Sequence, residues 1–455
     1  MLLEEQEPAA EEILRHMQKT LGADQIVPVF MGVAERDMGV RRLLEALIRE
    51  TPPPGISATR AGVDPRGETL AQVLKTYHLP HSGKLSLVRV WAGELKDGMT
   101  LGGMRVGGVY RMFGAQHNNV GGAQAGEIVG LGRLDEARTG QILTNGTGTS
   151  TAPLPTSEPL APMYAFALSA ENRNDEVKLS GALAKLVDED PSLRFEQDSE
   201  LQQSLLWGQG EIHLRVALDR LRSKYHIGVE GRPPQTPYRE TIRKSIQSHG
   251  RHKKQSGGHG QFGDVKLEIR PRARGEGFEF VDKIVGGSVP RQYIPAVEAG
   301  ARDFLKRGPL GFPVVDVGVT LFDGQFHSVD SSEIAFKMAT ALALKEGLAK
   351  CDPVLLEPIL AVEISVPSEY TSNVLQLTST KRGRILGYDA KQGWSGWDQV
   401  AAYMPQAEIH DLIVSLRSLT QGVAFFDWRF DHLDPVPDKL AETVVAHHQD
   451  HAQAS

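Results

Sequence analysis

Two segments of this sequence, 163–229 and 360–430, repeat one order of strand-like and helix-like stretches. In the first segment we expect a strand, a helix, two strands, a helix and a strand at 163–170, 175–187, 193–196, 201–207, 211–225 and 227–229. In the second we expect the same elements at 360–366, 368–380, 384–388, 397–404, 407–419 and 423–430. Both orders are βαββαβ, the ferredoxin-like split pattern. The repeat therefore predicts two α+β domains of one class, at 153–235 and 359–436.

The regions around this repeat differ from it in pattern. Residues 54–152 contain short alternating strands broken by glycine, which is typical of a small β-barrel. Residues 236–358, between the two repeated segments, combine strand-rich stretches with helical stretches at 291–308 and 331–351. They predict a mixed α/β domain.

The second helical stretch of that mixed domain has an expected start and an expected buried face. Asp330 is followed three residues later by Glu333, a capping-box arrangement that would satisfy free backbone N–H groups at the helix start. The apolar residues of the helix that we expect to face a core are Ile334, Met338, Ala341 and Leu348.

The two ends of the sequence predict less structure. Residues 1–53 carry two amphipathic helical stretches around an apolar strand at 26–30, which bury little by themselves. We therefore expect the C-terminal remnant of a larger α/β domain. Residues 437–455 are expected to form a tail, which is frayed over VVAHHQDHAQAS at 444–455.

Composition limits the class of protein. No apolar run approaches the roughly 18 residues of a membrane helix, and the acidic start has no signal-peptide pattern, so we expect a cytoplasmic protein without a membrane partner. The single cysteine, Cys351, excludes an internal disulfide and is interpreted as a packing residue.

Charge is distributed unevenly along the chain. The formal net charge is −7, which argues against general affinity for nucleic acid. Between residues 239 and 274, however, ten Lys and Arg residues stand against three acidic residues. This local excess is the kind of surface that an RNA backbone attracts, although solvated surface charge is the commoner outcome.

The stretch GHGQFG, at 258–263, has the spacing of a dinucleotide-binding fingerprint. That fingerprint must follow a strand and open a helix, so that a pyrophosphate meets the helix N-terminus. Here the preceding residues are polar and basic, and the following ones alternate as a strand. The glycines are therefore not interpreted as a nucleotide site.

Other catalytic patterns are weak or missing. The sequence contains no G-x-x-x-x-G-K-[ST] phosphate loop, no Asn-Lys-x-Asp motif and no G-x-S-x-G nucleophile elbow. Histidines gather near 249–259 and 447–451 without a cysteine, and no His-x-x-x-His lies on a predicted helix, so a metal site is not expected. We assign no catalytic residue to this chain.

Long stretches of the sequence resemble the bacterial elongation factor G family. KKQSGGHGQFG, at 253–263, is similar to that family's K-Q-S-G-G-x-G-Q-[YF]-G loop, and 278–300 and 312–339 match the same domain IV. GQGEIHLRVALDRLRSKYHI, at 208–227, resembles domain III, AQVLKTYHLPHSGKLSLVRVWAGELKDG, at 71–98, resembles domain II, and RGRILG, at 382–387, resembles domain V. The resemblance implies domains II to V, the C-terminal two-thirds of a translational GTPase, with a remnant of the GTPase domain before them.

The resemblance also implies partners and site residues. It implies a monomer that binds the ribosome, at the small-subunit decoding region and the large-subunit factor-binding RNA, and acts on tRNA and mRNA. The implied tip residues of domain IV are Ser256, Gly257, Gly258, His259, Gly260, Gln261 and His327. Supporting basic residues would be Lys253, Lys254, Lys381, Arg382 and Arg384. We expect no cofactor on this chain and GTP with Mg²⁺ on the full-length parent.

Some positions depart from the family pattern. Gly32, Val33 and Ala34 stand where the family has Ser-Ala followed by Phe or Leu on the guanine side of its nucleotide site. The departures indicate a divergent paralogue. Three functions therefore stay open: a translocase, a ribosome recycling or protection factor, and an RNA- or ribosome-binding module that does not use GTP.

Overall fold

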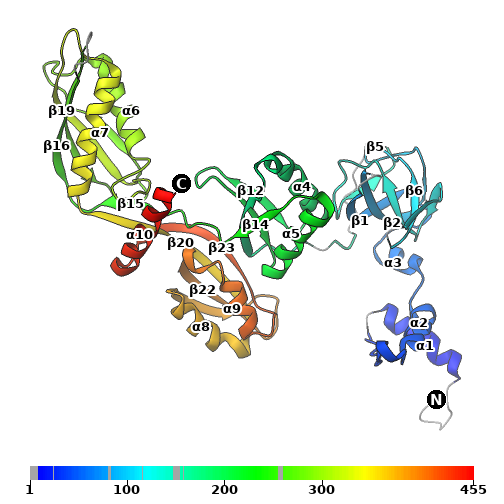
Figure 1. Cartoon of the computed structure of the whole chain (residues 1–455). Coiled ribbons are helices and arrows are strands. Elements are labelled where there is room, and N and C mark those ends of the chain that lie inside the picture. The colour runs from blue at the N-terminus through cyan, green and yellow to red at the C-terminus, as the bar shows by residue number, and fades with distance from the viewer. Residues whose placement is uncertain are drawn as a thin grey trace. The chain divides into compact units, whose positions relative to one another are not determined.

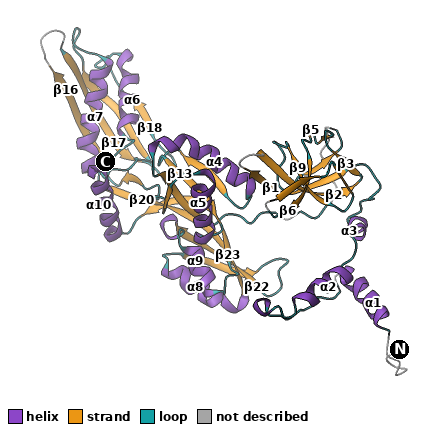
Figure 2. Ribbon diagram, turned by 45° about the vertical axis from the view of Figure 1, so that its right-hand side comes forward, coloured by secondary structure: helices purple, strands orange, loops and turns teal. Residues whose placement is uncertain are grey.

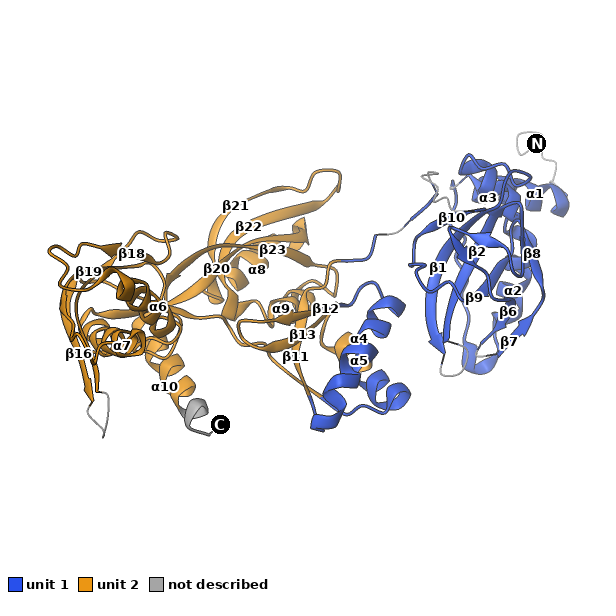
Figure 3. Cartoon of the chain, turned by 90° about the horizontal axis from the view of Figure 1, so that it is seen from above, with its two compact units in different colours: residues 1–160, 170–195, 217–229 blue, residues 161–169, 196–216, 230–455 orange. Residues whose placement is uncertain are grey.

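The computed structural model describes residues 9–23, 25–79, 83–114, 116–146, 154–156, 158–254 and 260–454, the last five of them by backbone alone. Contacts divide the chain into two compact units (Figure 3). The first unit comprises Met1–Leu160, Ala170–Phe195 and Ala217–Val229, and the second comprises Ala161–Ser169, Glu196–Val216 and Glu230–Ser455.

The first unit begins with three helices, α1 (Ala10–Gly22), α2 (Val40–Glu50) and α3 (Pro54–Arg60). The two amphipathic helices expected from the sequence are α1 and α2. The strand expected at 26–30 is not formed among the described residues of that stretch, because its backbone pairs with no neighbouring strand. Val27 and Val29 are 86% and 83% exposed, so these apolar side chains are not packed in a core.

The barrel predicted before residue 152 is the next part of the first unit. Its main sheet has the order β10-β1-β2-β9-β6-β7, formed by Ile142–Thr144, Leu70–Leu79, Gly83–Ala92, Ile128–Gly132, Val109–Phe113 and Gln116–Asn119. Two short ribbons join β3 (Glu94–Lys96) to β8 (Gly122–Gln124) and β4 (Thr100–Leu101) to β5 (Met104–Arg105). Side chains that alternate inward, such as Val73, Val88 and Leu131, form its buried core.

The first ferredoxin-like domain has the predicted βαββαβ order. Its elements are β11 (Tyr164–Ala170), α4 (Glu176–Glu189), β12 (Arg194–Asp198), β13 (Gln203–Gly208), α5 (Glu211–Tyr225) and β14 (Val229–Arg232). The four strands form one sheet in the order β12-β13-β11-β14. The predicted fold class is confirmed here.

Domain IV, in the second unit, is a four-stranded sheet with two helices against it (Figures 1 and 2). The order is β16-β17-β19-β18, formed by Ile246–Lys254, Gln261–Pro271, Val317–Gln325 and Glu279–Asp282. β18 runs parallel to β19, whereas the other pairs are antiparallel. The helices α6 (Ile294–Phe304) and α7 (Glu333–Lys350) contribute Val297, Phe336 and Ala343 to one core with Leu267 of β17.

The core side of α7 differs from the prediction. Ile334 and Met338 are 65% and 46% exposed, whereas Phe336 and Ala339 are fully buried. Of the predicted core residues of this helix, Leu348 is buried. Cys351 directly follows α7 and is fully buried, as expected for a packing residue, and its burial raises the pKa of the thiol to about 11.

The second ferredoxin-like domain is built on one long strand, β20 (Pro353–Pro367). Its other elements are α8 (Thr371–Thr380), β21 (Arg384–Ala390), β22 (Trp397–Pro405), α9 (Leu412–Leu419) and β23 (Phe425–Pro435). β22 and β23 pair antiparallel with either edge of β20, and β21 extends the sheet beyond β22. The start of β20 also pairs with β15 (Arg239–Ile242).

The prediction of a frayed C-terminal tail is wrong, because Asp438–Ala454 forms the helix α10. Its apolar face, with Leu440, Val444 and Val445, packs against Phe312 and Leu355. These contacts remove apolar surface from water, which stabilises a terminal helix that would otherwise fray. No helix among the described residues is long and apolar enough to cross a membrane.

Candidate nucleic-acid interface

Two loops of domain IV that are far apart in sequence meet at one end of its sheet. Gln261 opens β17 directly after Gly260, and His327 follows β19. An isolated parallel bridge between Phe262 and Ser331 joins the two loops. Four of the predicted tip residues, Ser256, Gly257, Gly258 and His259, lie outside the described residues. The structure thus brings together the three predicted tip residues that it describes.

The glycine-rich stretch connects β16 and β17, which are antiparallel partners from Ile246↔Ile269 to Lys254↔Gln261. A strand, β17, therefore follows it, and a helix does not. At Gly263 the absence of a side chain serves packing, because a Cβ there would lie 2.5 Å from the Ala335 carbonyl oxygen of α7. This glycine lets α7 pack closely against the strand that leads from the tip.

The Asp330–Glu333 capping box predicted for α7 is wrong. The N-cap residue is Ser332, whose hydroxyl accepts a hydrogen bond from the Ala335 N–H at 3.2 Å. Asp330 lies before the helix and points to the glycine-rich loop instead, where its Oδ1 accepts from the Gly260 N–H at 3.0 Å. Both Asp and Ser accept N–H hydrogen bonds well, so the sequence pattern alone could not separate the two positions.

His327 is half-exposed at the tip and is held by the turn that follows it. Its Nδ1 accepts hydrogen bonds from the backbone N–H groups of Val329 and Asp330, at 3.3 and 3.2 Å. Its side chain is 53% exposed, and its ring centroid lies 6.3 Å from that of Phe262. The side chain therefore has both a fixed orientation and access to a partner.

The positive charge near the tip is only partly neutralised within the domain. Asp264 is buried and lies 3.0 Å from His249 Nε2 and 3.4 Å from Arg251 Nε. Lys253 and Lys254, at the end of β16, are exposed and form no ion pair with a described residue. The two lysines are thus the cations that this end of the sheet offers to an outside anion.

The basic residues predicted in domain V have a different environment. Lys381 Nζ lies 2.6 Å from Asp411 Oδ1 and is mostly buried. Arg382 donates from Nη1 to Glu357 at 2.6 Å and from Nε to Glu408 at 2.8 Å, and hydrogen bonding to Glu357 raises its pKa above the ordinary value. We therefore assign structural roles to these two residues. Arg384 is exposed and has no ion pair with a described residue.

The Gly32–Ala34 segment of the first unit forms a tight turn. Val33 pairs with Met38 as an isolated bridge, and a Cβ on Gly32 would lie 2.7 Å from the Met38 carbonyl oxygen. A serine here would require the turn to open. The three residues carry no side-chain hydroxyl or charge, so any contact with a guanine nucleotide would have to come from their backbone groups.

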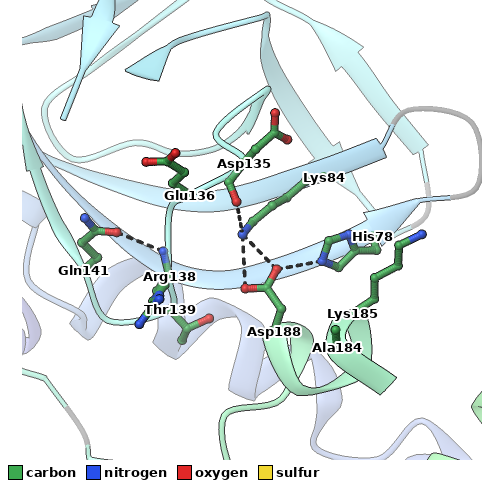
Figure 4. Close-up of a pocket in the computed structure, with 10 residues that line it drawn as sticks. All are labelled: His78, Lys84, Asp135, Glu136, Arg138, Thr139, Gln141, Ala184, Lys185 and Asp188. Atoms are coloured by element: carbon green, nitrogen blue, oxygen red, sulfur yellow. Dashed lines mark hydrogen bonds and ion pairs between the residues drawn. The ribbon is translucent and has the colours of Figure 1, made fainter. Parts of the chain in front are cut away.

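A polar cavity of about 870 Å³ in the first unit was not found from the sequence (Figure 4). Lys84 is buried there and donates to the carbonyls of Asp135 and Ala137 at 2.9 and 2.7 Å. Asp188 of α4 accepts from Lys84 and lies 2.7 Å from His78 Nε2. These partners satisfy one another, so the cluster joins the barrel to α4. The signal in the sequence was Lys84 within a mostly apolar strand that also carries Ser86 and Arg89.

No group of three or more His, Cys, Asp and Glu residues in the described part of the chain could hold a metal ion. The His447 and His448 side chains of α10 line an apolar cavity of about 480 Å³ with Tyr238 and Phe312. His448 stacks on the Phe312 ring at 4.4 Å between centroids. His448 thus has a packing role, whereas His447 is exposed.

Comparisons with known protein families agree along most of the chain. The matching family models are described as Elongation factor G domain 2, Elongation Factor G domain III, Elongation factor G domain IV and Elongation factor G C-terminus, at residues 68–146, 160–233, 234–352 and 354–444.

Individual relatives show the same similarity. The chain is 56% identical over 445 residues to an Elongation factor G-like protein from Synechocystis sp. (strain PCC 6803), covering 97% of this chain and 66% of that relative. A crystal structure of a Thermus thermophilus protein is similar with a TM-score of 0.74 and 35% identity, over 99% of this chain and 67% of that one. The chain therefore spans about two-thirds of the length of these proteins.

Proposed function

Because this chain belongs to the elongation factor G family, we propose that it is the ribosome-binding portion of a translational GTPase that promotes GTP-dependent movement of tRNA and mRNA. The observation that carries the proposal is the end of domain IV, where Gly260, Gln261 and His327 of two separate loops are brought together. The exposed Lys253 and Lys254 flank them.

The chemistry of this end suits RNA. RNA is recognised largely by its shape and through its phosphate and 2′-hydroxyl oxygens, which are hydrogen-bond acceptors. Lysine side chains, an exposed histidine and backbone N–H groups are suitable donors to these oxygens. In domain V, Arg384 is the remaining exposed candidate for contact with large-subunit RNA.

The proposed GTP chemistry is not assigned to residues of this chain. The sequence has no phosphate loop, and Gly32, Val33 and Ala34 provide no polar side chain for a guanine base. We propose that GTP and Mg²⁺ bind to the part of the full-length protein that corresponds to the remaining third of its relatives. The residues described above would bind RNA and position the domain, and they would hold no nucleotide.

The same turn favours a second candidate function. If the tight Gly32–Ala34 turn is incompatible with a guanine site, the protein is an RNA- or ribosome-binding module that works without GTP. The two functions differ in a single measurement, because a GTPase of this family would hydrolyse GTP faster when ribosomes are present. A recycling or protection factor would also do so, and it would then fail to support polypeptide synthesis.

The test is sedimentation of the full-length protein with ribosomes, together with measurement of GTP turnover and of single-round tRNA movement. We expect ribosome-stimulated hydrolysis and, for His327→Ala, movement slower by about tenfold or more with hydrolysis nearly unchanged. Exposed Glu333, six residues away, provides the control variant Glu333→Gln, which should behave as wild type. Absence of ribosome binding with or without GTP would contradict the proposal, and an equal loss of both rates would contradict a tip role for His327.

A further inference from the structure

Two neighbouring residues, Asp330 and Ser331, connect the two loops at the end of domain IV. The Asp330 carbonyl accepts from the Phe262 N–H at 2.8 Å, and its Oδ1 accepts from the Gly260 N–H at 3.0 Å. The Ser331 hydroxyl donates to the Phe262 carbonyl at 3.0 Å and accepts from the His327 N–H at 2.8 Å. Each of the two residues therefore bonds to the glycine-rich loop, and Ser331 also fixes the start of the His327 turn.

This turn decides which nitrogen of His327 carries hydrogen. A neutral imidazole has one N–H donor and one acceptor nitrogen, and the bond at one nitrogen sets the state of the other. Two backbone N–H groups point at Nδ1, which must therefore be the acceptor. The hydrogen is then on Nε2, which has no hydrogen-bond partner among the described residues.

Asp330 Oδ2 lies 3.2 Å from the same Nδ1 and suggests a competing arrangement, in which Nδ1 carries a hydrogen and donates to the carboxylate. That arrangement would require both backbone N–H groups to turn away from the ring. The carboxylate already accepts from Gly260 through Oδ1, so it has a partner without His327. The directed N–H groups are the stronger evidence, because their positions follow from the backbone.

We propose that Asp330 and Ser331 are positioning residues that lock the two loops together and hold His327 as its Nε2–H tautomer, so that Nε2–H donates to a phosphate or 2′-hydroxyl oxygen of RNA. The RNA acceptor rests on the proposed function, whereas the tautomer and the lock are properties of the free protein. A further hydrogen bond holds Ser331 in place, because the Tyr293 hydroxyl donates to the Ser331 carbonyl at 3.1 Å.

The first test uses this chain alone and two readouts. Long-range ¹⁵N imidazole spectra distinguish the two tautomers, and the His327 signal is identified by its loss in His327→Gln. Hydrogen exchange reports the amides of Gly260 and His327. We expect the Nε2–H tautomer in the wild type, and in Ser331→Ala a mixture of tautomers with His327 amide exchange faster by about tenfold. Ser331→Thr, which retains a hydroxyl, should restore both.

Substitutions of Asp330 separate the lock from the competing pair. Asp330→Asn keeps an oxygen for the Gly260 N–H and presents an NH₂ group to Nδ1, so it should preserve the Nε2–H tautomer. Asp330→Ala should speed Gly260 exchange by about tenfold. Glu333→Gln removes a nearby charge outside the lock and should change neither readout. The inference would be overturned by an Nδ1–H tautomer in the wild type, or by loss of the Nε2–H tautomer in Asp330→Asn.

The second test asks whether Nε2–H is the functional donor, using the full-length protein and ribosomes. The amide nitrogen of Gln reaches the place of Nε2, whereas that of Asn reaches only the place of Nδ1. We expect His327→Gln to retain single-round movement within about threefold and His327→Asn and Ser331→Ala to lose about tenfold, with GTP turnover unchanged.

The two tests fail in different ways. If the wild-type protein does not bind ribosomes, the proposed function and the RNA acceptor are both wrong, and the spectra alone decide the tautomer. If the wild-type protein moves tRNA but His327→Gln is as slow as His327→Asn, the functional donor is not Nε2–H and this inference is wrong, while the proposed function stands.

Discussion

The end of β16 in domain IV and the turn between α8 and β21 in domain V both carry basic residues, but the structure places them in different environments. Lys253 and Lys254 are exposed and have no carboxylate partner among the described residues. Lys381 and Arg382 are paired with Asp411, Glu357 and Glu408. A cation is available to RNA only where the fold leaves it unpaired, so residue type alone does not identify a binding surface.

The largest effect is expected for Arg382→Ala, which leaves the carboxylate of Glu357, 2% exposed, without its cation. Removing one member of a buried pair typically costs about 3–5 kcal/mol, and partial exposure of Arg382 reduces this to about 2–3 kcal/mol. Thermal unfolding, with hydrogen exchange at β20 to locate the change, measures it. Wild-type stability combined with weaker ribosome binding would show that Arg382 acts on RNA instead.

Glu240 sharpens the comparison because it is a buried carboxylate without a cation. Its oxygens accept from the N–H groups of Leu310 and Phe312, and its burial raises its pKa to about 7. Since the native state holds this proton more tightly than the unfolded state, the contribution of Glu240 to stability is full below pH 4.5 and is lost as pH rises to about 7.

We therefore expect Glu240→Gln to remove a decrease of roughly 2 kcal/mol in the free energy of unfolding between about pH 5 and pH 8. Thermal unfolding at several pH values measures this difference. Glu276→Gln, at an exposed carboxylate of the same domain, is the control and should retain the wild-type pH profile. An unchanged profile in Glu240→Gln would mean that other groups cause the pH dependence.

A smaller effect on stability and a specific effect on binding are expected for the double variant Lys253→Ala, Lys254→Ala. The free energy of unfolding should stay within about 0.5 kcal/mol of wild type, because neither side chain has an ion pair with a described residue. The slope of ribosome affinity against salt should fall by about 2, one for each lost phosphate contact. An unchanged slope would remove these lysines from the interface.

The smallest effect on binding is expected for Arg384→Ala, whose free energy of unfolding should also stay within about 0.5 kcal/mol of wild type. This variant is the matched control for Arg382→Ala, since the two residues are two positions apart and differ in pairing. If Arg384 meets large-subunit RNA, the salt slope falls by about 1. A stability loss as large as that of Arg382→Ala would contradict the distinction between paired and exposed cations.

Sequence reasoning worked best where an element has a strong period and its own core. The order of both ferredoxin-like domains and the helix α5, predicted at 211–225, follow from such patterns. It was less successful for α7, whose apolar residues surround the helix, so that periodicity could not decide which side is buried. Ile334 was expected to be buried in the core, but it is exposed and Phe336 is buried instead.

The remaining errors arise from contacts that are distant in sequence. α10 is ordered by Phe312 and Leu355, which no local pattern in 437–455 reveals. Asp330 has a good capping spacing, but its partner is Gly260, 70 residues earlier. Likewise, the pairing of Arg382 with Glu357 depends on the contact between β20 and the turn that follows α8. The predicted tip loops came from the family resemblance, and the lock between them required the structure.

The strand β20 gives domains IV and V a shared backbone. Pro353–Leu356 pairs with β15, and from Leu356 onward the same strand pairs with β23, so that the two ladders meet at one residue without an intervening loop. Bending at this point would require the rupture of ladder hydrogen bonds. We therefore expect β20 to act as a stiff connection, so that a rotation of the domain V sheet also moves the base of domain IV.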